Sequence, residues 1–140
     1  MENKPTFVPV VAAVIRDRVG RLLLQQCPAH KRHAGKWEFP GGKVETGETP
    51  RFALCREVAE ELALELDPAA MEPAGFAEEE PAGSGPRVVL FLYTCPVWRG
   101  EPEAREGQRW GWFAPDEARL LPLAEMDRAL FARLRPPPPG

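Results

Sequence analysis

The stretch EFPGGKVETGETPRFALCREVAEELAL, residues 38–64, decides the fold, because it joins a glycine-rich turn to a dense group of acidic residues. Like charges three or four positions apart on a helix repel each other by roughly 0.2–0.5 kcal/mol per pair. Such a cluster therefore predicts that something positive binds among the acids. The five acidic residues of the stretch are Glu45, Glu48, Glu57, Glu60 and Glu61.

The second half of this stretch predicts a helix of about 13 residues. Thr49 and Pro50 are a typical helix start, with the threonine as N-cap and the proline at the first helical position. Apolar residues then recur every three or four positions and predict one buried stripe, made of Phe52, Cys55, Ala59 and Leu62. The opposite, polar face carries Glu57, Glu60 and Glu61.

Two interpretations of this acidic face stay open on spacing alone: a solvated helix surface, or a cation site. A solvated face normally mixes charges, whereas Arg56 is the one cation that interrupts this group. Oxygen ligands without histidine or cysteine suit a hard divalent ion, Mg²⁺ or Mn²⁺, and disfavour zinc. Such a site points to phosphoryl chemistry, in which the metal neutralises phosphate charge.

The rest of the chain alternates strand and turn patterns. Strands are expected over residues 6–15, 21–26, 37–39, 74–79, 87–98 and 108–113, with a turn over 81–86. The first two strands read as a hairpin, and Pro9 predicts an edge position for the first. A short helix is expected from Pro115, and a last helix over 123–134 with a core stripe of Leu123, Met126, Leu130 and Leu134.

Length and composition bound the class of protein. A chain of 140 residues predicts one domain over residues 1–135, followed by a proline-rich, disordered tail over 136–140. The net charge of −3 gives no general attraction to nucleic acid or to an anionic membrane. Three cysteines without a paired motif predict reduced thiols and a cytoplasmic location, and we expect a monomer or a homodimer.

The residues of this stretch resemble the Nudix box, whose pattern is GX5EX7REUXEEXGU with U a bulky aliphatic residue. Gly42, then five residues, Glu48, then seven residues, and REVAEELAL match it. The one departure is Ala63, where the family has glycine. AGKWEFPGGKVETGET, REGQRWGWF and LPLAEMDRAL are similar to the MutT branch, the nucleoside triphosphate pyrophosphohydrolases. The resemblance implies an α/β fold, an α/β/α sandwich around a mixed β-sheet.

The resemblance also implies a role for particular residues. It implies metal binding, with Mg²⁺ as cofactor, by the Gly41 carbonyl and by Glu57, Glu60, Glu61 and Glu106. The catalytic group it implies comprises Glu57 as general base, Arg56 to orient it, and Glu60. Gly42 and Glu48 would support the junction between loop and helix, and Lys43 would face the substrate phosphates.

Base recognition is expected at Phe39 and at Asp127, where relatives place asparagine or aspartate. Aspartate can accept from an exocyclic amine and, when protonated, can also donate. Cys27 stands where relatives usually have arginine, and the basic residues His30, Lys31, Arg32 and His33 nearby either replace its phosphate contacts or form a plain basic loop.

Three functions compete at this point. The leading one is Mg²⁺-dependent hydrolysis of a nucleoside triphosphate to a monophosphate and pyrophosphate, with an oxidised purine such as 8-oxo-dGTP as substrate. The second is a pyrophosphohydrolase for CTP or another pyrimidine nucleotide. The third is a non-catalytic nucleotide-binding module, which the presence of Glu57, Glu60 and Glu61 disfavours.

Overall fold

A four-stranded mixed sheet forms the centre of the structure, which is a computed structural model describing residues 7–31, 33–79 and 85–136. β1 and β7 pair in parallel, whereas β4 joins β1 and β6 joins β7 antiparallel. The prediction of an α/β fold around a mixed sheet is therefore confirmed. The strand order is β4-β1-β7-β6, with β1 at Phe7–Val14, β4 at Gly41–Lys43, β6 at Glu72–Glu79 and β7 at Arg87–Thr94.

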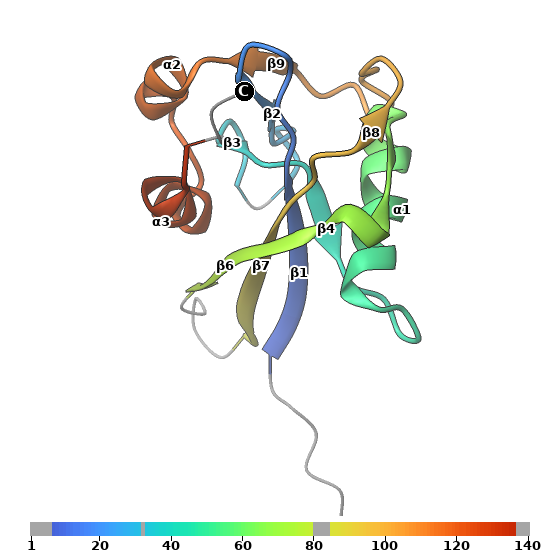
Figure 1. Cartoon of the computed structure of the whole chain (residues 1–140). Helices are drawn as coiled ribbons and strands as arrows, with labels where there is room; N and C mark the ends of the chain where they lie inside the picture. Colours follow the sequence, from blue (N-terminus) through green and yellow to red (C-terminus); the bar gives the residue numbers. More distant parts are fainter. Residues whose placement is uncertain (1–6, 32, 80–84, 137–140) are drawn as a thin grey trace, which may run out of the picture.

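Helices cover both sides of this sheet, α1 on one side and α2 with α3 on the other (Figure 1). Two small sheets complete the fold, one with the order β3-β2-β9 and one pairing β5 with β8. None of the helices in the described ranges is long and apolar enough to span a bilayer. The bounds are β2 Leu22–Gln26, β3 Trp37–Glu38, α1 Pro50–Leu62, β5 Glu65–Leu66, the 3₁₀ helix η1 Pro68–Ala70, β8 Trp98–Arg99, β9 Trp110–Phe113, α2 Pro115–Leu120 and α3 Glu125–Arg133.

Helix α1 begins where its capping residues predict. The Thr49 side chain accepts a hydrogen bond from the Phe52 backbone N–H at 3.3 Å, and Pro50 occupies the first turn. The helix ends at Ala63, which adopts the left-handed conformation with φ 61° and donates its N–H to the Ala59 carbonyl. Ala63 thus forms the turn for which the Nudix box has glycine. The left-handed backbone costs alanine roughly 1–2 kcal/mol.

The buried stripe of α1 differs from the prediction. Phe52 is 64% exposed, so the face centred on it points to solvent. The helix instead buries small and branched residues against the sheet, because two apolar stripes of similar spacing overlap in this sequence. The buried residues of α1 are Ala53, Leu54, Val58 and Leu62, and they share a core with Val11, Ala13 and Ile15 of the β1 region.

The other face of the sheet packs against α3. Alternate residues of a strand point to opposite faces, so Ala12 and Val14 of β1 join this second core. Met126 and Leu130 of α3 are buried there, and Leu123 is buried just before the helix. The predicted core stripe is confirmed for these three residues, whereas Leu134 is half-buried at the rim.

The predicted hairpin and the edge position of Pro9 are both wrong. β1 and β2 belong to different sheets and meet at one antiparallel bridge, Arg16 with Leu22. β1 lies inside its sheet, between β4 and β7. The Pro9 carbonyl accepts the Val44 N–H at 3.0 Å and therefore faces the β4 side of the strand. β4 pairs only with residues 10–12 of β1, so the missing N–H of Pro9 removes no hydrogen bond from the ladder.

Several predicted boundaries shift in the structure. The expected strand 87–98 divides into β7 and β8, the strand expected from 108 begins at Trp110, and the last helix begins at Glu125. Most of the predicted turn 81–86 and of the tail 136–140 lies outside the described residues.

Candidate functional site

Arg56 joins the loop before α1 to the helix itself. Its guanidinium donates from Nε and Nη2 to the two carboxylate oxygens of Glu48, at 2.6 and 2.8 Å. Nη2 also donates to the Lys43 carbonyl at 3.1 Å, and Glu48 accepts the Glu45 backbone N–H at 2.9 Å. The hydrogen bonds from Arg56 lower the pKa of Glu48 to about 2, so this carboxylate stays ionised and holds the loop.

The same arginine holds Glu57, the next residue of the helix. Nη1 of Arg56 donates to Glu57 Oε1 at 2.9 Å and to Glu60 Oε2 at 3.3 Å. The Glu57 side chain is 17% exposed, whereas that of Glu60 is 56% exposed. Burial raises the pKa of Glu57, and the Arg56 hydrogen bond partly opposes this rise. The carboxylate of Glu57 is therefore partly desolvated and fixed in position by Arg56, whereas Glu60 lies at the solvent edge.

Two glycines allow the β4 backbone to approach its neighbours closely. A Cβ atom on Gly42 would lie 2.3 Å from the carboxylate carbon of Glu57, and one on Gly41 would lie 1.9 Å from the Val11 carbonyl oxygen. Contacts shorter than about 3 Å do not occur between real atoms of these types. The absence of side chains at both positions thus lets Glu57 and β1 pack directly against β4.

Glu61 is held by two buried glutamines that the sequence patterns did not single out. Its Oε1 accepts from Gln25 Nε2 and from the Gly41 N–H, both at 3.2 Å. Gln108 Nε2 donates to Gln25 Oε1 at 3.0 Å and to the Glu61 carbonyl at 2.9 Å. The Glu106 N–H donates to Gln108 Oε1 at 3.0 Å. The network therefore connects the loop of Glu106 to helix α1.

A cavity of about 330 Å³ gathers three of the four predicted carboxylate ligands, and Glu60 is not part of its lining. Burial, and then the charge of Glu57, raise the pKa of Glu61 to about 8. Mutual repulsion of this kind, with oxygen donors and no histidine among them, fits a hard cation. The predicted residues that line the cavity are Gly41, Gly42, Lys43, Glu57, Glu61 and Glu106.

The carboxylates that line this cavity are nevertheless not positioned to coordinate one metal ion together. Within residues 7–31, 33–79 and 85–136, no three His, Cys, Asp or Glu side chains are already arranged to hold a metal ion together. The cation would have to draw the side chains of Glu57, Glu61 and Glu106 inward from the walls of the cavity. Their chemistry fits the ion, and their final geometry depends on its binding.

A second cavity of about 220 Å³ adjoins the first and shares Glu38, Gly41, Gly42 and Lys43 with it. Phe39 and Asp127, the two residues predicted to meet the base, both line this cavity. Asp127 is 4% exposed, and its Oδ2 accepts the Phe39 backbone N–H at 2.9 Å. Burial raises the pKa of Asp127 to about 7.

Glu38 is a further acid in this wall, which sequence reasoning placed in a short strand without a role. Burial, and then the charge of Asp127, raise the pKa of Glu38 to about 8. The strand pattern gave no signal for it, because its neighbour Asp127 lies far along the chain. His33 and Glu79 also line this cavity, and His33 Nε2 lies 3.2 Å from Glu79 Oε2.

The basic loop contributes unevenly to these cavities. Cys27 and Lys31 line the larger cavity, and His33 lines the smaller one. Cys27 is buried, so it stands at the cavity wall where the family resemblance led us to expect an arginine. His30 lines neither cavity, and Arg32 lies outside the described residues.

Comparison with known proteins identifies the family of the chain. A model of the NUDIX domain matches residues 6–134. The CTP pyrophosphohydrolase of Escherichia coli is 41% identical over 125 residues, which cover 89% of each chain. The 8-oxo-dGTP diphosphatase of Haemophilus influenzae is 36% identical, covering 82% of this chain and 89% of that protein. The crystal structure of a MutT Nudix hydrolase from Burkholderia pseudomallei has a TM-score of 0.81 at 29% identity, covering 94% of this chain and 100% of that one. The chain therefore belongs to the Nudix family and is a Nudix hydrolase.

Proposed function

We propose that this hydrolase converts a nucleoside triphosphate into a monophosphate and pyrophosphate, with Mg²⁺ as its cofactor and Mn²⁺ as a substitute. The observation that carries the proposal is the pair of adjoining cavities with a common wall. One is lined by carboxylates and Lys43, which suits metal-bound phosphates. The other holds the aromatic ring of Phe39, the buried Asp127 and the half-buried Glu38, which suit a base. We further propose a cytoplasmic protein, monomeric or homodimeric, with no nucleic-acid or membrane partner.

In this proposal Glu57 is the general base. It accepts a proton from water as the water oxygen forms a bond to an internal phosphorus, and the phosphoanhydride bond between the monophosphate and pyrophosphate parts of the substrate breaks. Arg56 holds Glu57 Oε1 and leaves Oε2 to receive the proton. The metal ligands would be the Gly41 carbonyl, Glu57, Glu60, Glu61 and Glu106, and the bound cation would neutralise charge on the phosphates.

The base would be read by Asp127, Glu38 and Phe39. Burial raises the pKa of both acids, which favours a protonated carboxyl in this wall near pH 7, and a protonated carboxyl can donate to a base edge as well as accept from it. We propose an oxidised purine such as 8-oxo-dGTP as the preferred substrate. CTP is the second candidate, and the 41% identity with a CTP pyrophosphohydrolase supports it.

The test is a panel of canonical and oxidised nucleoside triphosphates, in ribo and deoxyribo forms, assayed for pyrophosphate release with Mg²⁺. A preference for 8-oxo-dGTP or for CTP separates the two substrates. Release of inorganic phosphate instead of pyrophosphate would contradict the proposed bond cleavage, and no turnover of any triphosphate would contradict the substrate class.

Removing the Asp127 carboxylate is expected to affect substrate selection more than chemistry. For Asp127→Ala we expect kcat/KM on the preferred nucleotide to fall by roughly ten- to a hundredfold, the value of one hydrogen bond to a charged group. The kcat/KM for poor substrates should change little, because these nucleotides make no hydrogen bond to the buried carboxylate of Asp127. Asp127→Asn should change the ranking of bases, since asparagine cannot exchange a proton. The measurement is kcat/KM for 8-oxo-dGTP, dGTP, CTP and dCTP.

The matched control is Glu125→Ala, an exposed acid in the first turn of the same helix, which should leave all four values unchanged. An equal loss on all four nucleotides in Asp127→Ala would assign Asp127 a structural role through its hydrogen bond to Phe39.

Glu106 is expected to matter through the metal. Glu106→Gln should raise the Mg²⁺ concentration for half-maximal activity by about tenfold, the lower value for groups that support a metal site, and should lower kcat. The melting temperature should change little, because the structural hydrogen bond comes from the Glu106 backbone N–H. Glu103→Gln in the same loop is exposed and serves as control. Superimposable Mg²⁺ titrations of Glu106→Gln and wild type would remove Glu106 from the metal site.

A further inference from the structure

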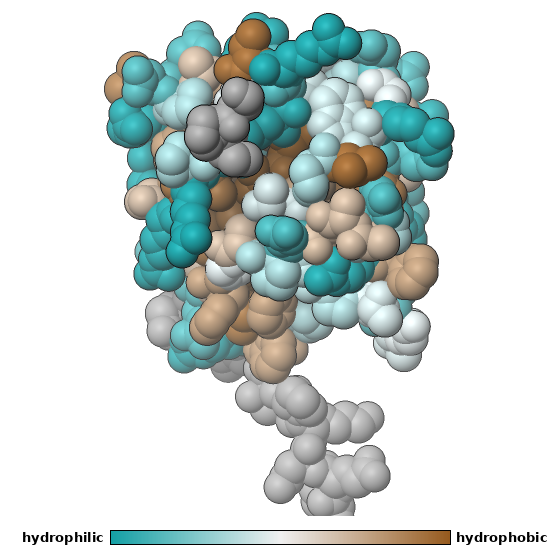
Figure 2. All heavy atoms as spheres, in the orientation of Figure 1, coloured by the Kyte–Doolittle hydropathy of each residue, from teal (hydrophilic) through white to brown (hydrophobic). Residues whose placement is uncertain are grey.

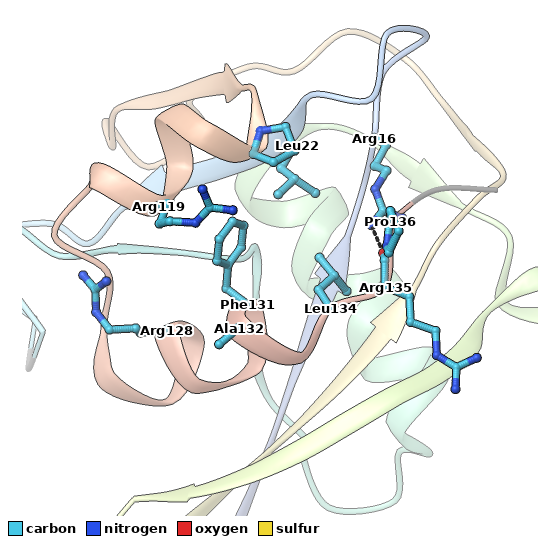
Figure 3. A pocket seen from close by; sticks show the side chains of 10 residues that line it. Arg16, Leu22, Arg119, Arg128, Phe131, Ala132, Leu134, Arg135 and Pro136 are labelled. Carbon is cyan, nitrogen blue, oxygen red and sulfur yellow. Dashed lines mark hydrogen bonds between the residues drawn. The ribbon is translucent and has the colours of Figure 1, made fainter. Parts of the chain in front are cut away.

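A further cavity, of about 510 Å³, lies away from the catalytic cavities and shares none of their lining residues. We call it the arginine cavity. It lies where the turn after β1, the start of β2, helix α2 and the second half of α3 meet (Figure 3). Its lining consists of Arg16, Leu22, Pro115, Arg119, Arg128, Phe131, Ala132, Leu134, Arg135 and Pro136.

The inner part of the arginine cavity is apolar. Leu22 is 1% exposed and belongs to the second core, whereas Phe131 and Leu134 are half-buried and pack against that core from the edge. On the face shown in Figure 2, apolar residues lie recessed between hydrophilic ones on the side of α2 and α3. A volume of this size and an apolar lining with a few polar groups are typical of small-molecule sites.

The charges around this apolar lining all have one sign. The four arginines are accompanied by no Asp or Glu in the lining, although the whole chain carries a net charge of −3. Figure 3 shows Arg16 and Arg119 on opposite sides of Leu22, while the side chains of Arg128 and Arg135 point outward. The charge of the cavity is therefore complementary to an anion held between Arg16 and Arg119.

Arg16 is the strongest indication that this cavity suits an anion. It is half-buried, and burial lowers the pKa of its guanidinium. Its Nη2 donates to the Arg135 backbone carbonyl at 2.8 Å, and the described residues provide no carboxylate within ion-pair distance of it. A partly desolvated charge without a counter-ion is costly, and a bound anion would offset that cost.

Arg119 is available to the same ligand. Its Nη1 pairs with Asp116 Oδ1 at 3.0 Å, but both side chains are largely exposed, so this pair holds the guanidinium only weakly. A planar guanidinium can bind phosphate oxygens in bidentate fashion and can also stack on an aromatic ring. Phe131 in the same lining offers a partner ring.

We propose that the arginine cavity binds a small aromatic phosphate monoester, with its phosphate between Arg16 and Arg119 and its ring against Leu22, Phe131 and Leu134. The two charges of a phosphate monoester match the two guanidinium groups of Arg16 and Arg119. The site is separate from the catalytic cavities, so this proposal stands independently of the substrate assigned above.

The experiment is calorimetric titration of the full-length protein with 2-naphthyl phosphate, with 2-naphthol and inorganic phosphate as half-ligands. We expect saturable binding of the ester at one site and at least tenfold weaker binding of each half-ligand. Arg119→Gln and Arg16→Gln should each raise the dissociation constant of the ester by about tenfold or more, as for one lost hydrogen bond between charged groups. Ala132→Trp should abolish binding by filling the cavity without removing a charge.

Controls separate this site from the rest of the molecule. Arg99→Gln removes an arginine on β8 that pairs with Glu65 and lines no part of this cavity, so ester binding should stay at the wild-type level. Nucleotide hydrolysis by Arg119→Gln and Ala132→Trp should be unchanged, which also shows that both variants are folded. Wild-type affinity in Ala132→Trp would place the ester elsewhere and overturn the proposal. Binding of an acidic peptide without binding of the ester would overturn it as well.

Discussion

Replacing Glu57 with glutamine is expected to lower kcat by at least about 100-fold, the lower range for loss of a general base, while the fold persists. Glutamine keeps the size of the side chain and an oxygen that can accept from Arg56, whose hydrogen bond to Glu57 Oε1 measures 2.9 Å. The change therefore removes the proton acceptor and a ligand charge with little effect on packing. The measurement is kcat at saturating nucleotide and Mg²⁺, together with the melting temperature.

Glu101→Gln is the matched control, because Glu101 is exposed and lines neither catalytic cavity. It should retain wild-type kcat and stability. If Glu57→Gln turned over nucleotide at a rate near that of the wild type, another group would have to accept the proton, and Glu57 would become a supporting residue.

Gly42→Ala is expected to lower kcat by about 100-fold although it changes no charge. A misplacement of about 1 Å in a catalytic group costs about this much, and the new methyl group would lie 2.3 Å from the Glu57 carboxylate. The flexible end of the Glu57 side chain would move in response, and the β4 backbone would stay in place. We therefore expect loss of activity with a free energy of unfolding close to that of the wild type.

Gly47→Ala gives the converse control. Gly47 has φ 85°, and no atom lies within 4 Å of the place that a Cβ would occupy, so alanine there strains the backbone without touching a neighbour. We expect it to lose roughly 1–2 kcal/mol of stability and to keep its kcat. Denaturant unfolding and kcat measured on both variants distinguish a displaced catalytic group from a general loss of stability. Retained activity in Gly42→Ala would show that Glu57 does not need its present position.

Helix α1 shows what the sequence could and could not predict about the fold. Its start at Pro50 and its length followed from local signals, because a cap and a first-turn proline act within a few residues. Its buried face did not follow, since Phe52 and Leu54 both begin plausible apolar stripes and the sheet decides between them. The same reason explains Pro9, whose place inside the sheet depends on where β4 ends.

In the candidate site, too, local sequence patterns predicted some residues and missed others. Glu57 and Glu61, which the spacing placed on one polar face of the helix, line one cavity. Glu38, Gln25 and Gln108 had no signal, because their role comes from contacts made by folding: Gln25 and Gln108 meet across 83 positions of sequence. The sequence could not predict that Glu60 is exposed at the solvent edge either, because helical spacing alone does not locate the mouth of the cavity.

The hydrogen bonds behind Glu61 all run in one direction. The Glu106 N–H donates to Gln108, Gln108 donates to Gln25, and Gln25 donates to Glu61. Each amide is fixed in orientation by the one before it, so the row ends by presenting a donor to an oxygen that is best satisfied when it carries negative charge. The loop that bears Glu106 and the helix that bears Glu61 are thereby linked through two side-chain amides, so the position of one segment constrains the position of the other.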